Sequence, residues 1–401
     1  MSSFKLPYFK LSGTGKDDKF IGVNLENNQI AFHYPLLYHL SADDDSKVQD
    51  ARKILEAVSL GKRYQEIVRQ DHHKSSSDEE NDAFHSMSFL IDDYMTFLRY
   101  PEKEKIQVKD GKGKINWKQT IKQETYISET GFSYPCLITT EKHRTDNLIA
   151  SIYRFTVLRS IRILGWLYGI QEDSYLLNSE NYQKNEIPML LQAVKNAKQK
   201  TFDNRKRRRL SHMACVLKSA LSEETKDDFL SYGTKEFDFS FEAMLRYYLT
   251  GDIHVKAEYN PKGFYVIDQQ QYEASSLRPD IVFKNDNDLY IFDAKYYSYA
   301  DNYDHRRLPS SESILKQYSY GEHLQNQFPD CKIHNCFVLP YDKSRNEQDA
   351  SKVFKYIGYA YGSWNNNDES AIKIYLVDLK HLIHNWTNYN DDVKQELFAA
   401  G

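Results

Sequence analysis

The pattern of hydrophobic and polar positions divides the 401-residue chain into three stretches, residues 1–100, 101–226 and 227–401. Short apolar runs between residues 8 and 34 predict a small β unit, and apolar residues at helical spacing predict helices between residues 45 and 100. In the second stretch, we expect a hairpin at 108–117 with a turn at Asp110-Gly111, a buried helix at 148–170 and a long helical region at 187–221. The first stretch is expected to contain a surface for DNA or for a partner protein.

The third stretch alternates between strand-like and helix-like patterns. It predicts a helix around residues 237–245, strands at 256–259, 264–267, 281–283 and 289–294, and a helix around residue 317. Strands at 332–339, 353–360 and 372–379 and a closing helix follow. This order is typical of an α/β domain with a mixed sheet flanked by helices.

The run of residues 281–294 predicts a hairpin that brings polar side chains together. Two short apolar runs are separated by the turn-forming residues 284–288, Lys-Asn-Asp-Asn-Asp. Asp280 precedes the first run, while Asp293 and Lys295 end the second. Because the two strands are antiparallel and side chains alternate between faces, these three residues should converge, with Asp293 and Lys295 on one face.

Such a convergence has a chemical use. The carboxylates of Asp280 and Asp293 and the carbonyl of Ala294 form a set of oxygen ligands that suits Mg²⁺ or Mn²⁺. Lys295 beside that ion could hold a phosphate oxygen or help to deprotonate the attacking water. The alternative is an exposed Asp–Lys pair of little energetic weight. The apolar run before Asp293 favours a buried strand instead, where an unpaired charge is costly.

Two further elements carry a family resemblance. Glu242 on the 237–245 helix, Pro279-Asp280, Asp293-x-Lys295 and then Gln317 with Tyr318 and Tyr320 follow one another in an order that resembles the PD-D/ExK nuclease superfamily. The segment 113–121, Gly-Lys-Ile-Asn-Trp-Lys-Gln-Thr-Ile, resembles the Gly-x-Ile-Asn-Trp-x-x-Thr element of LlaJI-type restriction endonucleases, which are relatives of the McrC nuclease subunit.

This resemblance implies a metal-dependent DNA endonuclease of a bacterial restriction system that acts in phage defence, on a PD-D/ExK core. Asp280, Asp293 and the Ala294 carbonyl would bind Mg²⁺, for which Mn²⁺ could substitute, and Glu242 would complete the metal site. Lys295 would act on the water and the scissile phosphate, and Gln317 would position Lys295 or the phosphate. The implied partners are double-stranded DNA, a separate GTP-hydrolysing AAA+ subunit of the McrB type, and a second copy in a homodimer. A DNA-binding or assembly subunit without cutting activity, and a repair nuclease, remain as alternatives.

Several residues outside the carboxylates are candidates for DNA contact. Arg278 could contact a phosphate or pair with a neighbouring acid. Lys112, Lys114 and Trp117 could face DNA or a partner, or form an exposed turn whose tryptophan packs on the body of the protein. Tyr320 is a further candidate. The basic run at 205–209 predicts either a phosphate-contacting helix face or a solvated one.

The composition of the chain limits how the protein can contact DNA and where it is expected to act. The formal net charge of −4 excludes a uniformly basic DNA coat, so DNA contact has to be local. The four cysteines, Cys136, Cys215, Cys331 and Cys336, contain no Cys-x-x-Cys pair and are expected to be reduced thiols. No apolar run approaches the ~20 residues of a membrane-spanning helix and no secretion signal is evident, so we expect a cytoplasmic protein without a membrane partner.

Overall fold

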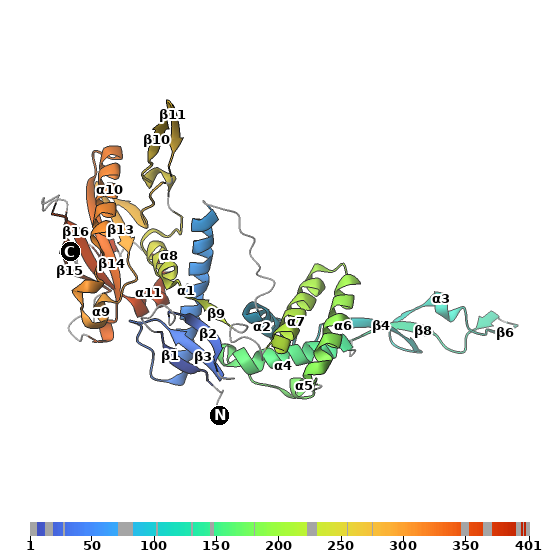
Figure 1. Cartoon of the computed structure of the whole chain (residues 1–401). Coiled ribbons are helices and arrows are strands. Elements are labelled where there is room, and N and C mark those ends of the chain that lie inside the picture. The colour runs from blue at the N-terminus through green and yellow to red at the C-terminus, as the bar shows by residue number, and fades with distance from the viewer. Residues whose placement is uncertain are drawn as a thin grey trace. The chain divides into compact units, whose positions relative to one another are not determined.

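The computed structural model forms two compact units (Figure 1). One unit contains residues 1–5 and 77–230, and the other contains residues 6–76 and 231–401. The structure describes residues 6–12, 19–26, 29–70, 83–101, 103–129, 131–144, 148–179, 181–222, 231–254, 256–274, 276–345, 353–363, 371–389, 394–395 and 397. We call the unit that includes the C-terminal half of the chain the sheet unit and the other the helical unit.

The sheet unit contains two sheets, one isolated hairpin and the helices that pack on them. Its strands are β1 (Tyr8–Leu11), β2 (Ile21–Glu26), β3 (Gln29–Tyr34), β9 (Tyr232–Thr234), β10 (Phe264–Ile267), β11 (Gln270–Glu273), β12 (Ile281–Asn285), β13 (Asp288–Ala294), β14 (Lys332–Tyr341), β15 (Phe354–Ala360) and β16 (Ile372–Asp378). Its α-helices are α1 (Asp44–Gln70), α8 (Phe237–Thr250), α9 (Tyr299–Asn302), α10 (Ser311–Gln327) and α11 (Leu379–Asn385).

The larger sheet has the strand order β12-β13-β14-β16-β15. The pairs β13–β14 and β14–β16 are parallel, whereas β12–β13 and β15–β16 are antiparallel, so the sheet is mixed as predicted. Strand β13 therefore has a neighbour on each side, which explains its nearly continuous apolar run. The predicted α/β class with a mixed sheet is confirmed, whereas the PD-D/ExK assignment of this sheet stays a prediction.

The smaller sheet has the order β1-β3-β2-β9 and joins distant parts of the chain. Strand β9 pairs with β2 through the register Ile21 to Thr234. Helix α1 packs against α8, and Gly61 permits the close approach, because a Cβ at this position would lie 2.1 Å from Ser240 Oγ. The N-terminal β unit and α1 therefore belong with residues 231–401, and the division differs from the three stretches that the sequence pattern predicts.

The helical unit contains four long or medium helices and a group of short strands. Its elements are α2 (Ala83–Phe97), β4 (Lys103–Lys109), β5 (Lys114–Ile115), α3 (Trp117–Thr120), β6 (Tyr126–Ser128), β7 (Gly131–Ser133), β8 (Ile138–Arg144), α4 (Leu148–Tyr168), α5 (Ser174–Leu177), α6 (Ile187–Gln199) and α7 (Asn204–Ser222). Helices α2, α4 and α7 pack together, and each has fully buried apolar residues, such as Leu90, Val157 and Leu210. The long helical region predicted at 187–221 is thus two helices, separated at residues 200–203.

Two local predictions differ from the structure. The stretch 256–259 is not a strand, because Ala257–Tyr259 form a 3₁₀ helix that inserts Tyr259 into the core against Phe328 at a ring distance of 6.0 Å. The segment 108–117 is not a simple hairpin, because β4 and β5 both pair with β8, which lies between them. Strand β8 begins more than twenty residues after β5, so this pairing could not be read from the local pattern.

Candidate active site

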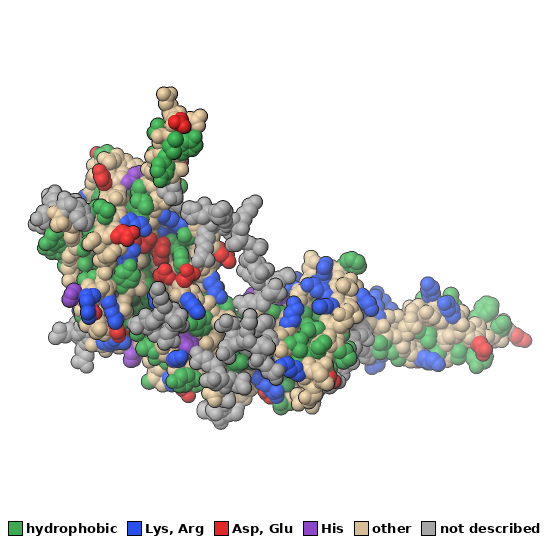
Figure 2. Space-filling view, in the orientation of Figure 1, with side chains coloured by type: hydrophobic (Ala, Val, Ile, Leu, Met, Phe, Trp, Pro, Cys, Tyr) green, Lys and Arg blue, Asp and Glu red, His purple; other side chains and the backbone are tan. Residues whose placement is uncertain are grey.

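The hairpin of β12 and β13 brings the predicted acidic residues to one end of the larger sheet. Ile281 pairs with Phe292, so Asp280 and Asp293 lie at the same end, one residue beyond that pair. Asp286 adopts a positive φ of 52° in the turn at the other end, a conformation that short polar side chains tolerate. Acidic side chains gather over β13 and α8, with basic ones beside them (Figure 2).

Asp293 and Lys295 share a face of the sheet, as predicted. The Lys295 Nζ lies 2.7 Å from Asp293 Oδ2, and both side chains are mostly withdrawn from solvent. The other carboxylate oxygen, Asp293 Oδ1, is buried and has no hydrogen-bond partner among the described residues. Burial opposes the charge on Lys295, but the adjacent carboxylate of Asp293 raises the pKa of this lysine. Lys295 is therefore a cation in the resting protein.

Asp280 is held against the backbone of the neighbouring strand. Its Oδ2 accepts a hydrogen bond of 2.8 Å from the backbone N–H of Ala294. Burial, followed by the negative charges of Glu242 and Asp293, raises the pKa of Asp280 well above its ordinary value. The carboxylates of Glu242 and Asp293 thus lie close enough to Asp280 to disfavour its ionisation.

Glu242 reaches this group from helix α8 and is supported by Arg246 on the same helix and by Tyr64 and Arg278 from two other parts of the sequence. The hydroxyl of Tyr64 on α1 donates a hydrogen bond to Glu242 Oε1, and Arg246 Nη2 lies 3.7 Å from the same oxygen. Arg278 Nη2 donates to the Tyr64 hydroxyl at 3.2 Å. Burial raises the pKa of Glu242, and Asp293 adds to this rise, while Tyr64, Arg246 and Arg278 oppose it.

The site fits a divalent cation in its chemistry, although its carboxylates are not gathered into a ready ligand group. Among the described residues, no set of three or more His, Cys, Asp or Glu side chains is positioned to hold a metal ion. Yet Asp293 Oδ1 is buried without a partner, and the pKa values of Asp280 and Glu242 are raised by neighbouring negative charge. A Mg²⁺ ion would satisfy the first feature and relieve the second.

Gln317 and Tyr320 on α10 hydrogen-bond to the backbone of β13 and of the segment before β12, and a role of Gln317 in positioning Lys295 or the phosphate stays a prediction. Gln317 is fully buried, and its Nε2 donates to the carbonyl of Ile291 at 2.8 Å. Tyr320 is also fully buried, and its hydroxyl donates to the carbonyl of Arg278 at 2.7 Å. The prediction that Tyr320 contacts DNA is therefore corrected, because a side chain without exposed surface cannot touch a macromolecule. Gln317 fixes the backbone two residues before Asp293.

Arg278 contacts Tyr64, and its charge acts on the neighbouring acid Glu242, whose pKa it lowers. Its guanidinium lies over the ring of Tyr64, 5.5 Å from the ring centre, and donates to the hydroxyl of the same residue. This arrangement holds Tyr64 in place next to Glu242. A contact of Arg278 with DNA stays a prediction.

The remaining candidates for DNA contact belong to the helical unit, whereas the carboxylates belong to the sheet unit. Lys112 and Lys114 are exposed, and Trp117 is 56% exposed, so this tryptophan does not pack on the body of the protein. In the basic run on α7, Arg209 is buried in an ion pair with Asp93 at 2.8 Å, while Arg205 and Arg207 are exposed. One member of the run is thus structural, and DNA contact by the others stays a prediction.

Sequence reasoning missed Tyr64 and Arg246. The spacing of four residues between Glu242 and Arg246 on a helix is a signal that could have identified the arginine. No local pattern indicates Tyr64, which is 178 positions away from the glutamate that it contacts.

Comparisons with known proteins assign the chain to a family. A model of the LlaJI restriction endonuclease family matches residues 20–376, so the protein belongs to this family of restriction endonucleases. The type II restriction enzyme BsuMI component YdjA of Bacillus subtilis (strain 168) is 24% identical over 356 residues, which are 85% of this chain and 76% of the relative. A solved structure of Thermococcus gammatolerans McrB AAA+ hexamers with bound McrC aligns with 94% of this chain and 83% of that chain, at a TM-score of 0.36 and 13% identity.

The family membership confirms the predicted resemblance and supports a role in a restriction system. Within the part of the chain that the structure describes, no helix is long and apolar enough to cross a membrane. The four cysteines are free thiols, as predicted.

Proposed function

We propose that the protein is a metal-dependent DNA endonuclease that hydrolyses phosphodiester bonds as the cleaving component of a bacterial restriction system. The observation that carries this proposal is the meeting of Asp280, Asp293 and Lys295 at one end of β12 and β13. There the buried Asp293 Oδ1 lacks a partner among the residues that the structure describes. Acids that are largely withdrawn from solvent and incompletely neutralised are costly to a fold, so their presence favours a functional explanation. Membership of a restriction endonuclease family agrees with it.

Each residue has a role in this proposal. Asp280, Asp293 and the carbonyl of Ala294 would hold Mg²⁺, with Glu242 completing the site, and Mn²⁺ would substitute. The bound ion supplies Lewis-acid stabilisation of the phosphate and a lower pKa for its coordinated water. Lys295, charged beside Asp293, stabilises the negative charge that develops on the scissile phosphate. Gln317, which donates to the carbonyl of Ile291 on β13, would position Lys295 or the phosphate, and Tyr64 would position Glu242.

The proposal includes a separate AAA+ partner of the McrB type that hydrolyses GTP. This part rests on the resemblance to McrC-related nucleases. The motor would deliver DNA, whereas the carboxylates of this chain would do the cutting. A DNA-binding or assembly subunit without cutting activity is the competing assignment.

The test is cleavage of supercoiled plasmid by the purified chain in Mg²⁺, Mn²⁺ or EDTA, with and without an AAA+ subunit from the same system and GTP. We expect metal-dependent cutting that falls by at least about 10²-fold in Asp293→Asn. The matched control is Asp330→Asn, the same substitution at an exposed position of the same unit, which should cut like wild type. If folded wild-type protein binds DNA but cuts under none of these conditions, the competing assignment replaces this one.

A further inference from the structure

The sheet unit contains a cavity of about 550 Å³. Some of the residues that line it come directly after the candidate active-site residues in the sequence. Tyr296, Tyr297 and Ser298, which directly follow Lys295, form one wall. The start of α8 forms another, and the rest comes from residues before α1, such as Ile21 and Leu37, and from residues 306–308. Its volume lies in the range of cavities that hold small organic ligands.

The lining of the cavity combines an apolar interior with cations. Leu37, Phe237 and Leu308 line it together with Tyr296, whose ring lies 5.1 Å from that of Phe237. Such a lining suits a flat heterocycle, because any nucleic-acid base can stack on an aromatic side chain. The aromatic pair is fixed, since Phe237 is buried and Tyr296 also packs against Phe241 at 5.8 Å.

Four cationic side chains belong to the same lining: Lys19, Lys235, Arg306 and Arg307. Arg307 is held in place, because its Nη1 donates to Ser298 Oγ at 2.8 Å and lies 3.6 Å from Asp301. Lys235 is exposed and makes no hydrogen bond or ion pair among the residues that the structure describes. An unpaired lysine and an oriented guanidinium are both suited to phosphate.

Two carboxylates, Glu236 and Asp238, also line the cavity. Glu236 already accepts a hydrogen bond from Gln65, whereas Asp238 is exposed. Acidic groups next to the cations disfavour a ligand that is anionic throughout. They suit a ligand whose negative charge is confined to one end and whose other end carries N–H donors. A nucleotide has this distribution, with a phosphate at one end and a base at the other.

We propose that this cavity binds a single nucleotide of the DNA strand, with the base against Tyr296 and Leu308 and the phosphate on Lys235 and Arg307. This proposal deepens the proposed nuclease function and rests on it for the identity of the strand. Because Tyr296 directly follows Lys295, a nucleotide in the cavity would fix the strand next to the cutting residues. Extrusion of one base costs a few kcal/mol, which stacking on an aromatic wall offsets.

The experiment uses the full chain in EDTA, so that no DNA is cut. The first probe is a thymidine oligonucleotide with one central 2-aminopurine, whose fluorescence is quenched by stacking. The second is the free 2-aminopurine deoxyribonucleoside monophosphate. Wild-type protein should lower the fluorescence of the oligonucleotide. Both Lys235→Glu and Leu308→Trp should weaken its binding at least about tenfold, because the first places a negative charge where the phosphate would bind and the second fills space that the base would occupy. Lys284→Glu, at an exposed lysine on β12 outside the cavity, should bind like wild type.

The outcomes separate this proposal from the nuclease assignment. If both cavity variants melt like wild type and still quench and bind as wild type does, the cavity proposal is overturned, whatever the cutting assay gives. If only the free monophosphate binds, the cavity belongs to a free nucleotide and the assignment to the DNA strand is overturned. Cavity-dependent quenching by a protein that cuts under no condition would overturn the nuclease function and leave the nucleotide site standing.

Discussion

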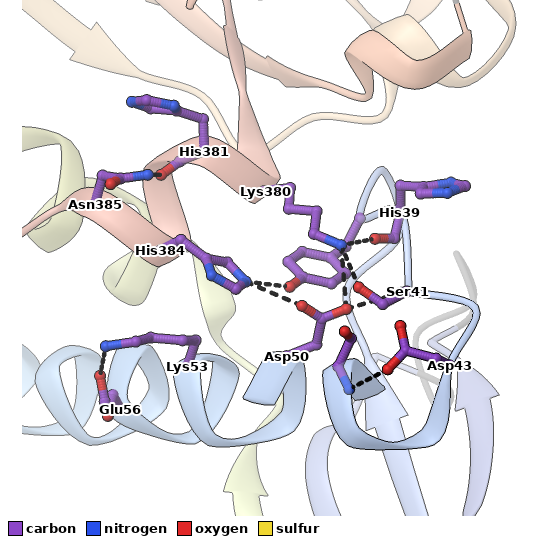
Figure 3. A network of polar contacts seen from close by, with 12 residues as sticks. His39, Ser41, Asp43, Asp50, Lys53, Glu56, Lys380, His381, His384 and Asn385 are labelled. Atoms are coloured by element: carbon purple, nitrogen blue, oxygen red, sulfur yellow. Dashed lines mark hydrogen bonds and ion pairs between the residues drawn. The ribbon is translucent and has the colours of Figure 1, made fainter. Parts of the chain in front are cut away.

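Two places in the sheet unit hold acids that are withdrawn from solvent, and they differ in how completely those acids are neutralised. Asp50 on α1 is 1% exposed and accepts hydrogen bonds from the backbone N–H of Ser41 at 2.8 Å, Lys380 Nζ at 3.2 Å and His384 Nε2 at 3.0 Å (Figure 3). Burial opposes its ionisation, but the hydrogen bonds from His384 and Ser41 hold the pKa of Asp50 below its ordinary value.

The acids at the end of β13 are less completely neutralised than Asp50. Asp280, Asp293 and Glu242 lie near one another, burial and mutual repulsion raise the pKa of Asp280, and one oxygen of Asp293 has no partner among the described residues. The comparison teaches that burial alone does not distinguish a structural acid from a functional one. The distinction lies in whether the surrounding residues complete its hydrogen bonds and balance its charge.

The largest expected effect comes from Asp280→Asn. The substitution removes one charge from the repelling group, so cutting should fall by about 10²- to 10³-fold while the free energy of unfolding is no lower than that of wild type. Plasmid cleavage and urea unfolding measure the two quantities. A large loss of stability with normal cutting would show that Asp280 is a structural acid like Asp50.

Mg²⁺ should stabilise the folded protein through this group. At a hundredfold excess over its dissociation constant, a ligand of the folded state adds about 2.7 kcal/mol to the free energy of unfolding. The melting temperature should rise with Mg²⁺ in wild type and not in Asp293→Asn. Because Asp280 and Glu242 have raised pKa values and must lose protons to bind the ion, the rise should shrink in acid. An equal rise in both proteins would place the ion elsewhere.

Asp50→Asn should have the opposite effects to Asp280→Asn, with a loss of stability and normal cutting. We expect it to lower the free energy of unfolding by about 2 kcal/mol, because hydrogen bonds to a charged group are lost, and to leave cutting unchanged where the protein is folded. A carboxyl whose folded pKa is depressed contributes its stability above its unfolded pKa of about 4 and loses it as the pH falls toward the folded value. The difference from wild type in urea unfolding should therefore be full at pH 7 and decrease below about pH 4.

Tyr64→Phe should have the smallest effect of the four, a decrease in cutting of about tenfold, equivalent to about 1.4 kcal/mol. The ring remains under Arg278, but Glu242 loses the hydroxyl that lowers its pKa. The acid limb of the pH profile of cutting should therefore move to higher pH, a shift that a purely structural change would not cause. An unchanged profile would remove Tyr64 from the positioning of Glu242.

The sequence by itself determined the hairpin of β12 and β13 and the meeting of Asp280, Asp293 and Lys295 at its end. Turn residues and the alternation of side chains in a strand are local, so residues 280–295 contain all the information that this part of the site needs. The helix that carries Gln317 was predictable for the same reason.

Only the tertiary structure decided which residues complete the site and which lie in the core. Tyr64 meets Glu242 across 178 positions, and Asp50 meets Lys380 across 330. Tyr320 has the residue type of a DNA contact but is fully buried, because its face of α10 packs on β13. Such contacts depend on how helices pack on the sheet, and this packing combines segments whose separation along the chain leaves no trace in local periodicity.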